Sequence, residues 1–332
     1  MNVDAEAIAA VEPAPGPVAT GGRSVLRWIA WALIGAAIAA FVVAGDVRTA
    51  WIVGDLEPID ERVALPRIAS LLLLLGLALH CVHQLRARRA LPADRYRGPA
   101  ILALVALSIG VAVLVTLPYQ RTLNLLFEGG RPDVIPLLVW QTASQLAMLC
   151  VAWLAVLRPK ALPGHRLFAD PAPVRHAVIG IVGGVLGFAL VLGASVLEAL
   201  LRTGVIPPIF SSDVPITMWT PGFPMALAAG ATILLTPIAE ELFFRGVALE
   251  AWRHEYGTAV ALIGSSVLFG LIHFGLTPIE FLPSEAPRRA ILAVSGLIFA
   301  VLALRTGSLI APIAAHATLN GIPFAIAFAL SQ

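Results

Sequence analysis

The chain has 332 residues, of which 59% are hydrophobic and only 13% are charged. Ordinary globular proteins carry about 25% charged residues, so this composition excludes a water-soluble globular domain. It predicts an all-α, polytopic integral membrane protein in contact with lipid, with about eight or nine transmembrane helices. The net charge of +2 is too small to indicate a nucleic-acid partner.

Residues 1–24 are rich in Ala, Pro and Gly and include Asp4, Glu6 and Glu12. A cleaved signal peptide needs a basic start close to its apolar run, so we expect a disordered N-terminal tail instead. Beyond it, nine apolar runs approach the length of about 20 residues that spans a membrane. They are 28–45, 67–85, 99–118, 134–157, 176–201, 224–245, 258–275, 290–304 and 309–330. The first and the eighth are short, which leaves eight or nine spans.

The loops between these runs differ in charge. Loop 86–98 carries five arginines against one acid, and loop 158–175 carries four basic residues against one acid. Loop 46–66 carries five acids against two arginines. Cytoplasmic loops are enriched in Lys and Arg, so the two basic loops predict a cytoplasmic N-terminus. We expect residues 25–160 to form about four accessory transmembrane helices, and residues 175–330 to form the functional core.

Ionisable and amide side chains are concentrated in three of the last four runs. Glu240, Glu241 and Arg245 lie in the run 224–245, His273 closes 258–275, and His316 and Asn320 lie in 309–330. A charge in hydrocarbon costs from about 2.5 kcal/mol upward, so such residues face a protein interior or a wet cavity. Together they predict one functional site.

The spacing of these residues predicts which of them lie at one depth. Glu240 and His273 are 33 positions apart, and their midpoint is at Tyr256–Gly257, within a polar break. An antiparallel hairpin that turns there puts both side chains at the same height, about 24 Å from the turn at 1.5 Å per residue. Glu240 and His273 would then supply a base and an orienting partner for an attacking water.

The helical period assigns the remaining side chains. Glu241 and Arg245 are four residues apart with the acid first, the better orientation for an ion pair. Glu240 points about 100° away from Glu241 and stays free to face a cavity. His316 and Asn320 share a helix face, and their two donors suit the oxyanion that forms from a peptide carbonyl.

Three spaced motifs carry a family resemblance: Glu240-Glu241-x-x-x-Arg245, Phe269-x-x-x-His273 and His316-x-x-x-Asn320. Their order, each within an apolar run, resembles the CPBP family of intramembrane endopeptidases, the CAAX-protease and bacteriocin-processing (Abi) proteins. This family includes the Ras-converting endoprotease. The similarity covers roughly residues 175–330.

The resemblance implies a peptidase whose residues have distinct roles. Glu240 would be the general base that activates water, and His273 would help to hold that water. His316 and Asn320 would stabilise the oxyanion. The other motif residues, Glu241, Arg245 and Phe269, would support the site.

The family has been argued to be either metal-dependent or glutamate-dependent. If Zn²⁺ were the cofactor, its ligands would be Glu240, His273 and His316. The sequence has no HExxH motif, and Asn320 suits an oxyanion role better than a zinc ligand. We therefore favour a glutamic mechanism with no metal or cofactor, and keep zinc as the alternative.

Two non-enzymatic functions compete with the peptidase. An immunity or scaffold protein could keep the fold, but a degenerate relative would be expected to lose a motif residue. A transporter could use the acids as a proton relay, but it predicts internal repeats, and we find none. The Ala- and Arg-rich composition indicates a bacterial source and its inner (plasma) membrane. We expect a membrane-anchored substrate, such as a leader peptide or a C-terminal sorting helix.

Overall fold

In a computed structural model of the protein, the parts described are residues 25–44, 61–126, 134–163, 170–205, 223–273 and 282–330. These ranges are helical with short connections and contain no strand. Five helices are long and apolar enough to cross a membrane, and four shorter apolar helices accompany them. The protein is therefore an all-helical polytopic membrane protein, as its composition predicts. The predicted tail 1–24 lies outside the described residues.

Each of the nine predicted apolar runs overlaps a helix. The first helices are α1 (Val25–Ala44), α3 (Glu61–Arg88), α4 (Ile101–Leu126), α5 (Val134–Ala152), which continues as a π-helical turn to Leu157, and α6 (Pro173–Thr203). One long helix follows, composed of α7 (Phe223–Ala229), a π-helical segment Gly230–Leu235, α8 (Thr236–Glu241), a second π-helical segment Leu242–Leu249, and α9 (Glu250–Tyr256). The last helices are α10 (Thr258–Ile272), α11 (Leu282–Thr306) and α12 (Ile310–Leu330).

Glycines with positive φ end three of these helices. Gly204 follows α6 with φ 70°, Gly257 separates α9 from α10 with φ 86°, and Gly307 separates α11 from α12 with φ 62°. Only glycine adopts this backbone region without steric cost, so each position is a sharp end for a helix. The predicted turn at Tyr256–Gly257 is confirmed.

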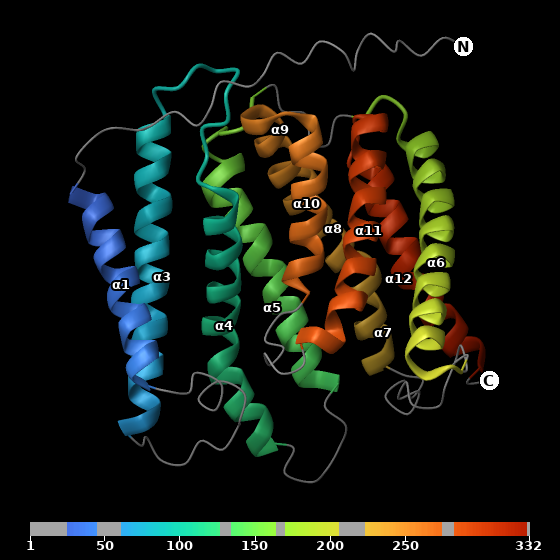
Figure 1. The fold of residues 1–332 in the computed structure, drawn as a ribbon, viewed down its shortest axis with the longest axis horizontal. Coiled ribbons are helices and arrows are strands. Elements are labelled where there is room, and N and C mark those ends of the chain that lie inside the picture. Colours follow the sequence, from blue (N-terminus) through green and yellow to red (C-terminus); the bar gives the residue numbers. More distant parts are fainter. Residues whose placement is uncertain are drawn as a thin grey trace.

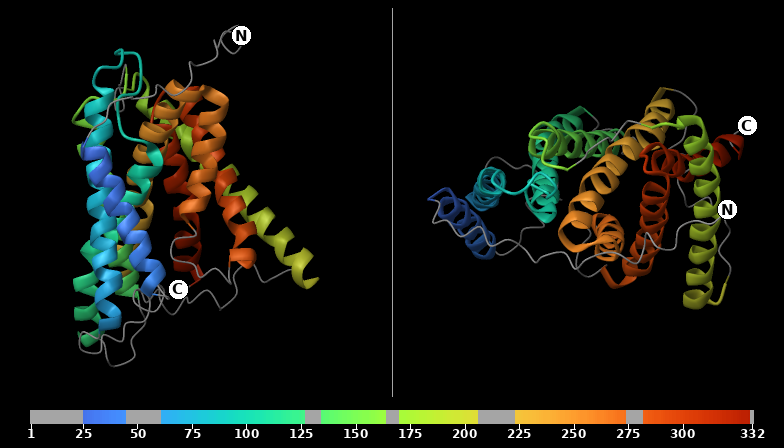
Figure 2. Two further views of the ribbon diagram at one scale, coloured as in Figure 1. Left: turned by 60° about the vertical axis from the view of Figure 1, so that its left-hand side comes forward. Right: turned by 90° about the horizontal axis from the view of Figure 1, so that it is seen from above.

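The helix that runs from α7 to α9 is at the centre of the bundle. Half of its most apolar stretch is buried, against 17–33% for the other four candidate spans. It contacts α5 on one side and α11 and α12 on the other (Figure 2). The buried face of such a helix can carry charged groups that would be costly against lipid.

The N-terminal helices form a row on one side of this centre (Figure 1), in which α1 packs on α3, α3 on α4, and α4 on α5. The two predicted basic loops lie together at one end of the bundle, since Arg97 donates its backbone N–H to the carbonyl of Ala161 at 2.8 Å. At the same end, Arg88 of α3 forms an ion pair with Glu255 of α9 at 2.6 Å. These contacts join the first helices to the turn between α9 and α10.

A polar junction at this end fixes the start of α6 against the turn between α11 and α12. Asp170 accepts hydrogen bonds from the backbone N–H of Ala172, the hydroxyl of Ser308 and the ring of His176. Burial works to raise the pKa of Asp170, but these hydrogen bonds outweigh it and lower the pKa below its ordinary value. The junction sets the register in which α6 lies along α12.

Glycines let α6 approach α12 closely. A Cβ at Gly180 would lie 2.2 Å from the carbonyl oxygen of Ala311, and one at Gly184 would lie 2.4 Å from that of Ala315. Small residues at such positions are how membrane helices bring their backbones together. The contact supports the segment of α12 that carries His316.

We expect Gly184→Ala to destabilise the protein, because the added methyl group must push α6 and α12 apart. Overpacking of this kind typically costs about 1–3 kcal/mol. Gly193→Ala on the same helix is the matched control, since a Cβ there meets nothing within 4 Å. Thermal unfolding in detergent should show a lower midpoint for Gly184→Ala alone; equal midpoints for the two variants would contradict this packing.

Candidate active site

Both candidate glutamates lie on α8, the single α-helical stretch between two π-helical segments. Turns of π-helix are rare and are frequently found at functional sites. Within the second segment, Phe243, Phe244, Arg245 and Val247 are all at most 1% exposed. The sequence therefore places two acids and a guanidinium on a buried, irregular part of the central helix.

Glu240 is 5% exposed, and its two carboxylate oxygens differ in their surroundings. Oε1 accepts a hydrogen bond from Nε2 of Gln145 on α5 at 3.0 Å. Oε2 is buried without a hydrogen-bond partner among the described residues, and lies 3.9 Å from Nε2 of His316. That distance is too long for a direct hydrogen bond and is one that a bridging water can span.

Glu241 and Arg245 form the predicted ion pair, with Nη1 of Arg245 3.0 Å from Oε1 of Glu241 and both side chains fully buried. Nη2 of Arg245 also donates to the carbonyl of Gly296 on α11 at 2.9 Å. Burying a charge is costly unless it is paired and hydrogen-bonded. Each charge here has such a partner, although Oε2 of Glu241 and Nε of Arg245 have none among the described residues. The pair thereby connects the central helix to α11.

Aromatic rings surround the guanidinium of Arg245. Its central carbon lies 4.5 Å from the ring centroid of Phe269, 5.3 Å from that of Phe299 and 5.7 Å from that of Phe244. A cation over a ring face is stabilised by the negative charge of that face, more strongly when it is desolvated. Phe269, a residue of the second motif, thus supports the first motif through Arg245.

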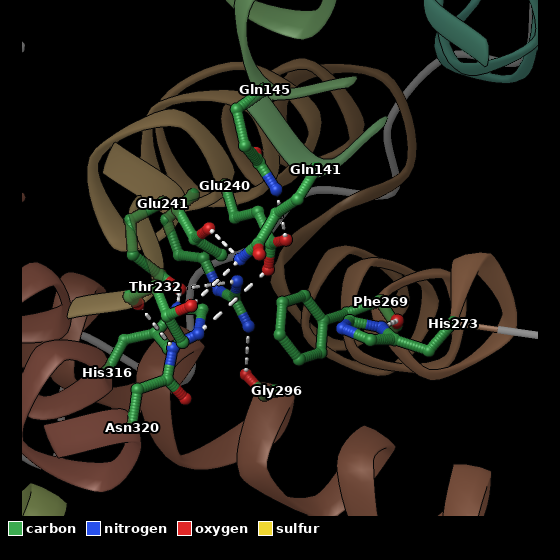
Figure 3. A network of polar contacts seen from close by, with 12 residues as sticks. Gln141, Gln145, Thr232, Glu240, Glu241, Phe269, His273, Gly296, His316 and Asn320 are labelled. Atoms are coloured by element: carbon green, nitrogen blue, oxygen red, sulfur yellow. Dashed lines mark hydrogen bonds and ion pairs between the residues drawn. The ribbon is translucent and has the colours of Figure 1, made fainter. Parts of the chain in front are cut away.

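His316 lies between the two glutamates (Figure 3). Its Nδ1 is 2.8 Å from Oε1 of Glu241, the oxygen that also accepts from Arg245. An ionised carboxylate can only accept, so Nδ1 of His316 must carry the proton. The ring stacks on Phe299 with centroids 4.9 Å apart and an interplanar angle of 17°. Both contacts fix the direction in which Nε2 points, toward Glu240.

Asn320 is held at a break in the central helix. In the π-helical segment, Thr236 donates its N–H to the carbonyl five residues earlier. Continuing that pattern, residue 237 would donate to Thr232, but Pro237 has no N–H. Nδ2 of Asn320 donates to this carbonyl instead, at 3.0 Å. One of its two amide protons is therefore committed to the backbone.

His273 lies at the C-terminal end of α10 and is half-buried. Its Nδ1 is 2.6 Å from the carbonyl of Phe269, which can only accept, so Nε2 is the unprotonated nitrogen of the neutral ring. In the part of the chain that the structure describes, His273 makes no hydrogen bond to Glu240 or Glu241. Figure 3 shows its ring beyond that of Phe269, with the two centroids 4.8 Å apart.

One known protein family matches the part of the chain that carries the three motifs. Residues 221–322 match the family described as type II CAAX prenyl endopeptidase Rce1-like. This part of the chain is similar to the CAAX-protease family, and we call residues 221–322 the CAAX-protease segment. The match includes all three motifs, from Glu240 to Asn320, and none of α5 or α6. Searches of the curated proteins and of the solved structures gave no match.

The zinc alternative can be tested on the geometry of this CAAX-protease segment. The described residues hold no group of three or more His, Cys, Asp or Glu side chains arranged to bind a metal. His316 directs Nδ1 to Glu241, and His273 directs Nδ1 to the carbonyl of Phe269. Within the described residues, Glu240, His273 and His316 are not gathered into a metal-binding group, and zinc remains the alternative to the glutamic mechanism.

Two glutamines of α5 belong to the site, although the sequence analysis assigned this helix to an accessory region. Gln145 contacts Glu240, and Nε2 of Gln141 lies 2.9 Å from the hydroxyl of Thr236 and 3.2 Å from that of Thr232. The signal was present in the sequence: two amides four residues apart, on one helix face inside an apolar run. The spacing of the two glutamines does not predict which helix they face.

Proposed function

We propose that the protein is an intramembrane endopeptidase that hydrolyses a peptide bond of a membrane-associated protein or peptide. The observation that carries the proposal is the buried Oε2 of Glu240, which has no hydrogen-bond partner among the described residues and faces Nε2 of His316 at 3.9 Å. A carboxylate oxygen without a donor is costly inside a membrane-spanning helix, and such a residue is typical of a functional site. The match of residues 221–322 to the CAAX-protease family supports the same class of reaction.

Glu240 is the general base in this proposal. Its Oε2 removes a proton from a water molecule while Oε1 is held by Gln145. A positioned base of this kind contributes about 10²–10⁴ in rate. His273 helps to hold the water through Nε2, since its Nδ1 is committed to the carbonyl of Phe269. The water attacks the peptide carbonyl, and the proton taken up by Glu240 passes to the leaving amine.

His316 and Asn320 stabilise the oxyanion. Asn320 has a second amide proton besides the one given to Thr232. His316 acts as the imidazolium, which donates Nδ1–H to Glu241 and Nε2–H toward the reacting carbonyl. Two carboxylates, one guanidinium and one imidazolium give the buried cluster a net charge of zero. Charge neutrality is what a low-dielectric interior favours.

The substrate follows from location and chemistry. A site on the central membrane helix reaches peptides that are themselves held in the membrane, so lipids and a membrane-anchored substrate are the partners. In the inner membrane of a bacterium, with the basic end and the N-terminus cytoplasmic, leader peptides and C-terminal sorting helices are such substrates. Residues 175–330 would form the peptidase core and 25–160 the accessory helices, with α5 as the exception.

The test is proteolysis in reconstituted liposomes, on a pooled library of tagged, membrane-anchored peptides in water enriched in ¹⁸O. We expect peptide products that carry one ¹⁸O in the new carboxylate, formed equally well with and without a strong zinc chelator. Products abolished by the chelator and restored by Zn²⁺ would replace the glutamic mechanism with the zinc-dependent one. No product from any peptide would favour the immunity or scaffold protein, and proton flux without product would favour the transporter.

A further inference from the structure

Gln145 is the one described side chain outside the CAAX-protease segment that touches the proposed catalytic carboxylate. It lies on α5, which packs against α8 across the bundle. The amide and the carboxylate are both almost fully buried, with 6% of Gln145 and 5% of Glu240 exposed. Little water competes with a hydrogen bond to a charged group in such a buried place, so the bond is correspondingly strong.

The chemistry of this contact fixes its direction. An ionised carboxylate only accepts hydrogen bonds, so the NH₂ group of Gln145 must face Glu240. The bond occupies Oε1 and leaves Oε2 as the oxygen directed to His316. The two oxygens of a carboxylate are chemically equivalent, so the effect of the amide is to fix the plane of the carboxylate, with one oxygen held and the other directed to His316.

The other end of the amide indicates that Gln145 does more than join two helices. Its Oε1 is buried without a hydrogen-bond partner among the described residues, as is Oε2 of Glu240. A purely structural glutamine would be expected to satisfy both ends of its amide, because each buried polar atom left unpaired costs free energy. An unpaired acceptor beside the catalytic oxygen is suited to a proton of the water or of the substrate amide.

Gln145 is itself held in place by its helix. Gln141, one turn earlier, donates to the hydroxyls of Thr232 and Thr236, which both lie in the turn of the central helix just before Pro237. This second contact sets the register of α5 against α8. The amide of Gln145 therefore reaches Glu240 from a fixed position, which is what a precise catalytic geometry needs.

We propose that Gln145 is a positioning residue of the peptidase: it holds Oε1 of Glu240 so that Oε2 alone faces the attacking water. This inference rests on the proposed function. It makes α5 part of the active site and predicts that the CAAX-protease segment is insufficient without it.

The first test compares Gln145→Met and Gln145→Glu with Ser144→Ala. Methionine and glutamate keep the size of the side chain and remove its amide donor. Ser144 is the control, because its hydroxyl bonds only to the carbonyl of Trp140 within α5. On the best-cleaved peptide of the liposome library, we expect kcat to fall about tenfold to hundredfold in both Gln145 variants with KM nearly unchanged. Wild-type kcat in Gln145→Met would overturn the proposal.

The second test needs no activity and separates the contact from the reaction. Gln145→Met leaves Oε1 of Glu240 buried and unpaired, so it should lower the thermal midpoint of the wild type. In a protein that already carries Glu240→Met, the amide of Gln145 has lost its acceptor. Gln145→Met then removes an unpaired amide, so the thermal midpoint should stay the same or rise. Equal decreases in both backgrounds would show that the two side chains do not interact, and would overturn the proposal.

Together the two tests distinguish the positioning role from the proposed function. Cleavage by wild type, lost in Glu240→Met but kept in Gln145→Met, overturns the positioning role alone. Absence of cleavage by wild type overturns the proposed function, and with it the catalytic role of Gln145. The thermal midpoints of the single and double variants would still show whether Gln145 and Glu240 interact.

Discussion

Arg245→Met should strongly destabilise the protein. The substitution removes the cation that pairs with Glu241 at 3.0 Å and leaves that carboxylate charged in a fully buried position. It also removes the donor to Gly296 and the cation enclosed by three aromatic rings. Breaking a buried pair by deleting one partner typically costs about 3–5 kcal/mol. Thermal unfolding in detergent, and the yield of monodisperse protein, would measure the loss.

The double variant Glu241→Gln with Arg245→Met decides whether the loss comes from the stranded charge. With both charges gone, we expect a large part of the stability to return, because replacing both members of a buried pair costs far less than removing one. Arg253→Met is the control, since Arg253 pairs with Glu250 at the surface. A double variant as unstable as Arg245→Met would show that packing of the guanidinium, rather than its charge, is what matters.

His316→Ala should remove nearly all cleavage. His316 is the residue that meets both glutamates, with Nδ1 bonded to Glu241 and Nε2 facing Glu240. Without it, the oxyanion loses a charged donor and Glu240 loses its counter-charge. We expect cleavage in liposomes to fall by about 10²–10³-fold, the usual effect of removing one oxyanion donor.

His254→Ala provides the comparison for that result. His254 is on α9, with Nε2 3.9 Å from Oε2 of the partly exposed Glu250, and is apart from the buried cluster. We expect its loss to leave cleavage within about twofold of wild type, because surface pairs contribute little. Equal cleavage by His316→Ala and His254→Ala would remove His316 from the mechanism.

The features that the sequence predicted correctly depend on local spacing. Apolar runs predict membrane helices because the backbone can satisfy its hydrogen bonds only within a helix there. The turn at Gly257 and the pair Glu241–Arg245 follow from residues at most a few positions apart, whose relative geometry the helix itself fixes.

The features that the sequence analysis missed depend on tertiary contacts. The two glutamines of α5 could be recognised as polar residues in an apolar run, but their partners lie more than 90 positions away. The contact of Asn320 with the carbonyl of Thr232, which takes one of its two amide protons, also depends on a residue far along the chain, Pro237. The contact of the His273 ring with that of Phe269, 4.8 Å between centroids, was not predicted either (Figure 3). The predicted common depth of Glu240 and His273 stays a prediction.

Cleavage by Glu240→Gln tests the central claim most directly. Glutamine keeps the size of the side chain and can still accept from Gln145, so the fold and the contact with α5 should persist while the base is lost. Wild type, Glu240→Gln and the surface control Glu250→Gln would be reconstituted into the same liposomes with the membrane-anchored peptide library. If Glu240 is the general base, wild type and Glu250→Gln should give product, and cleavage should fall about 10²–10⁴-fold in Glu240→Gln. Cleavage by a folded Glu240→Gln at the wild-type rate would contradict this role.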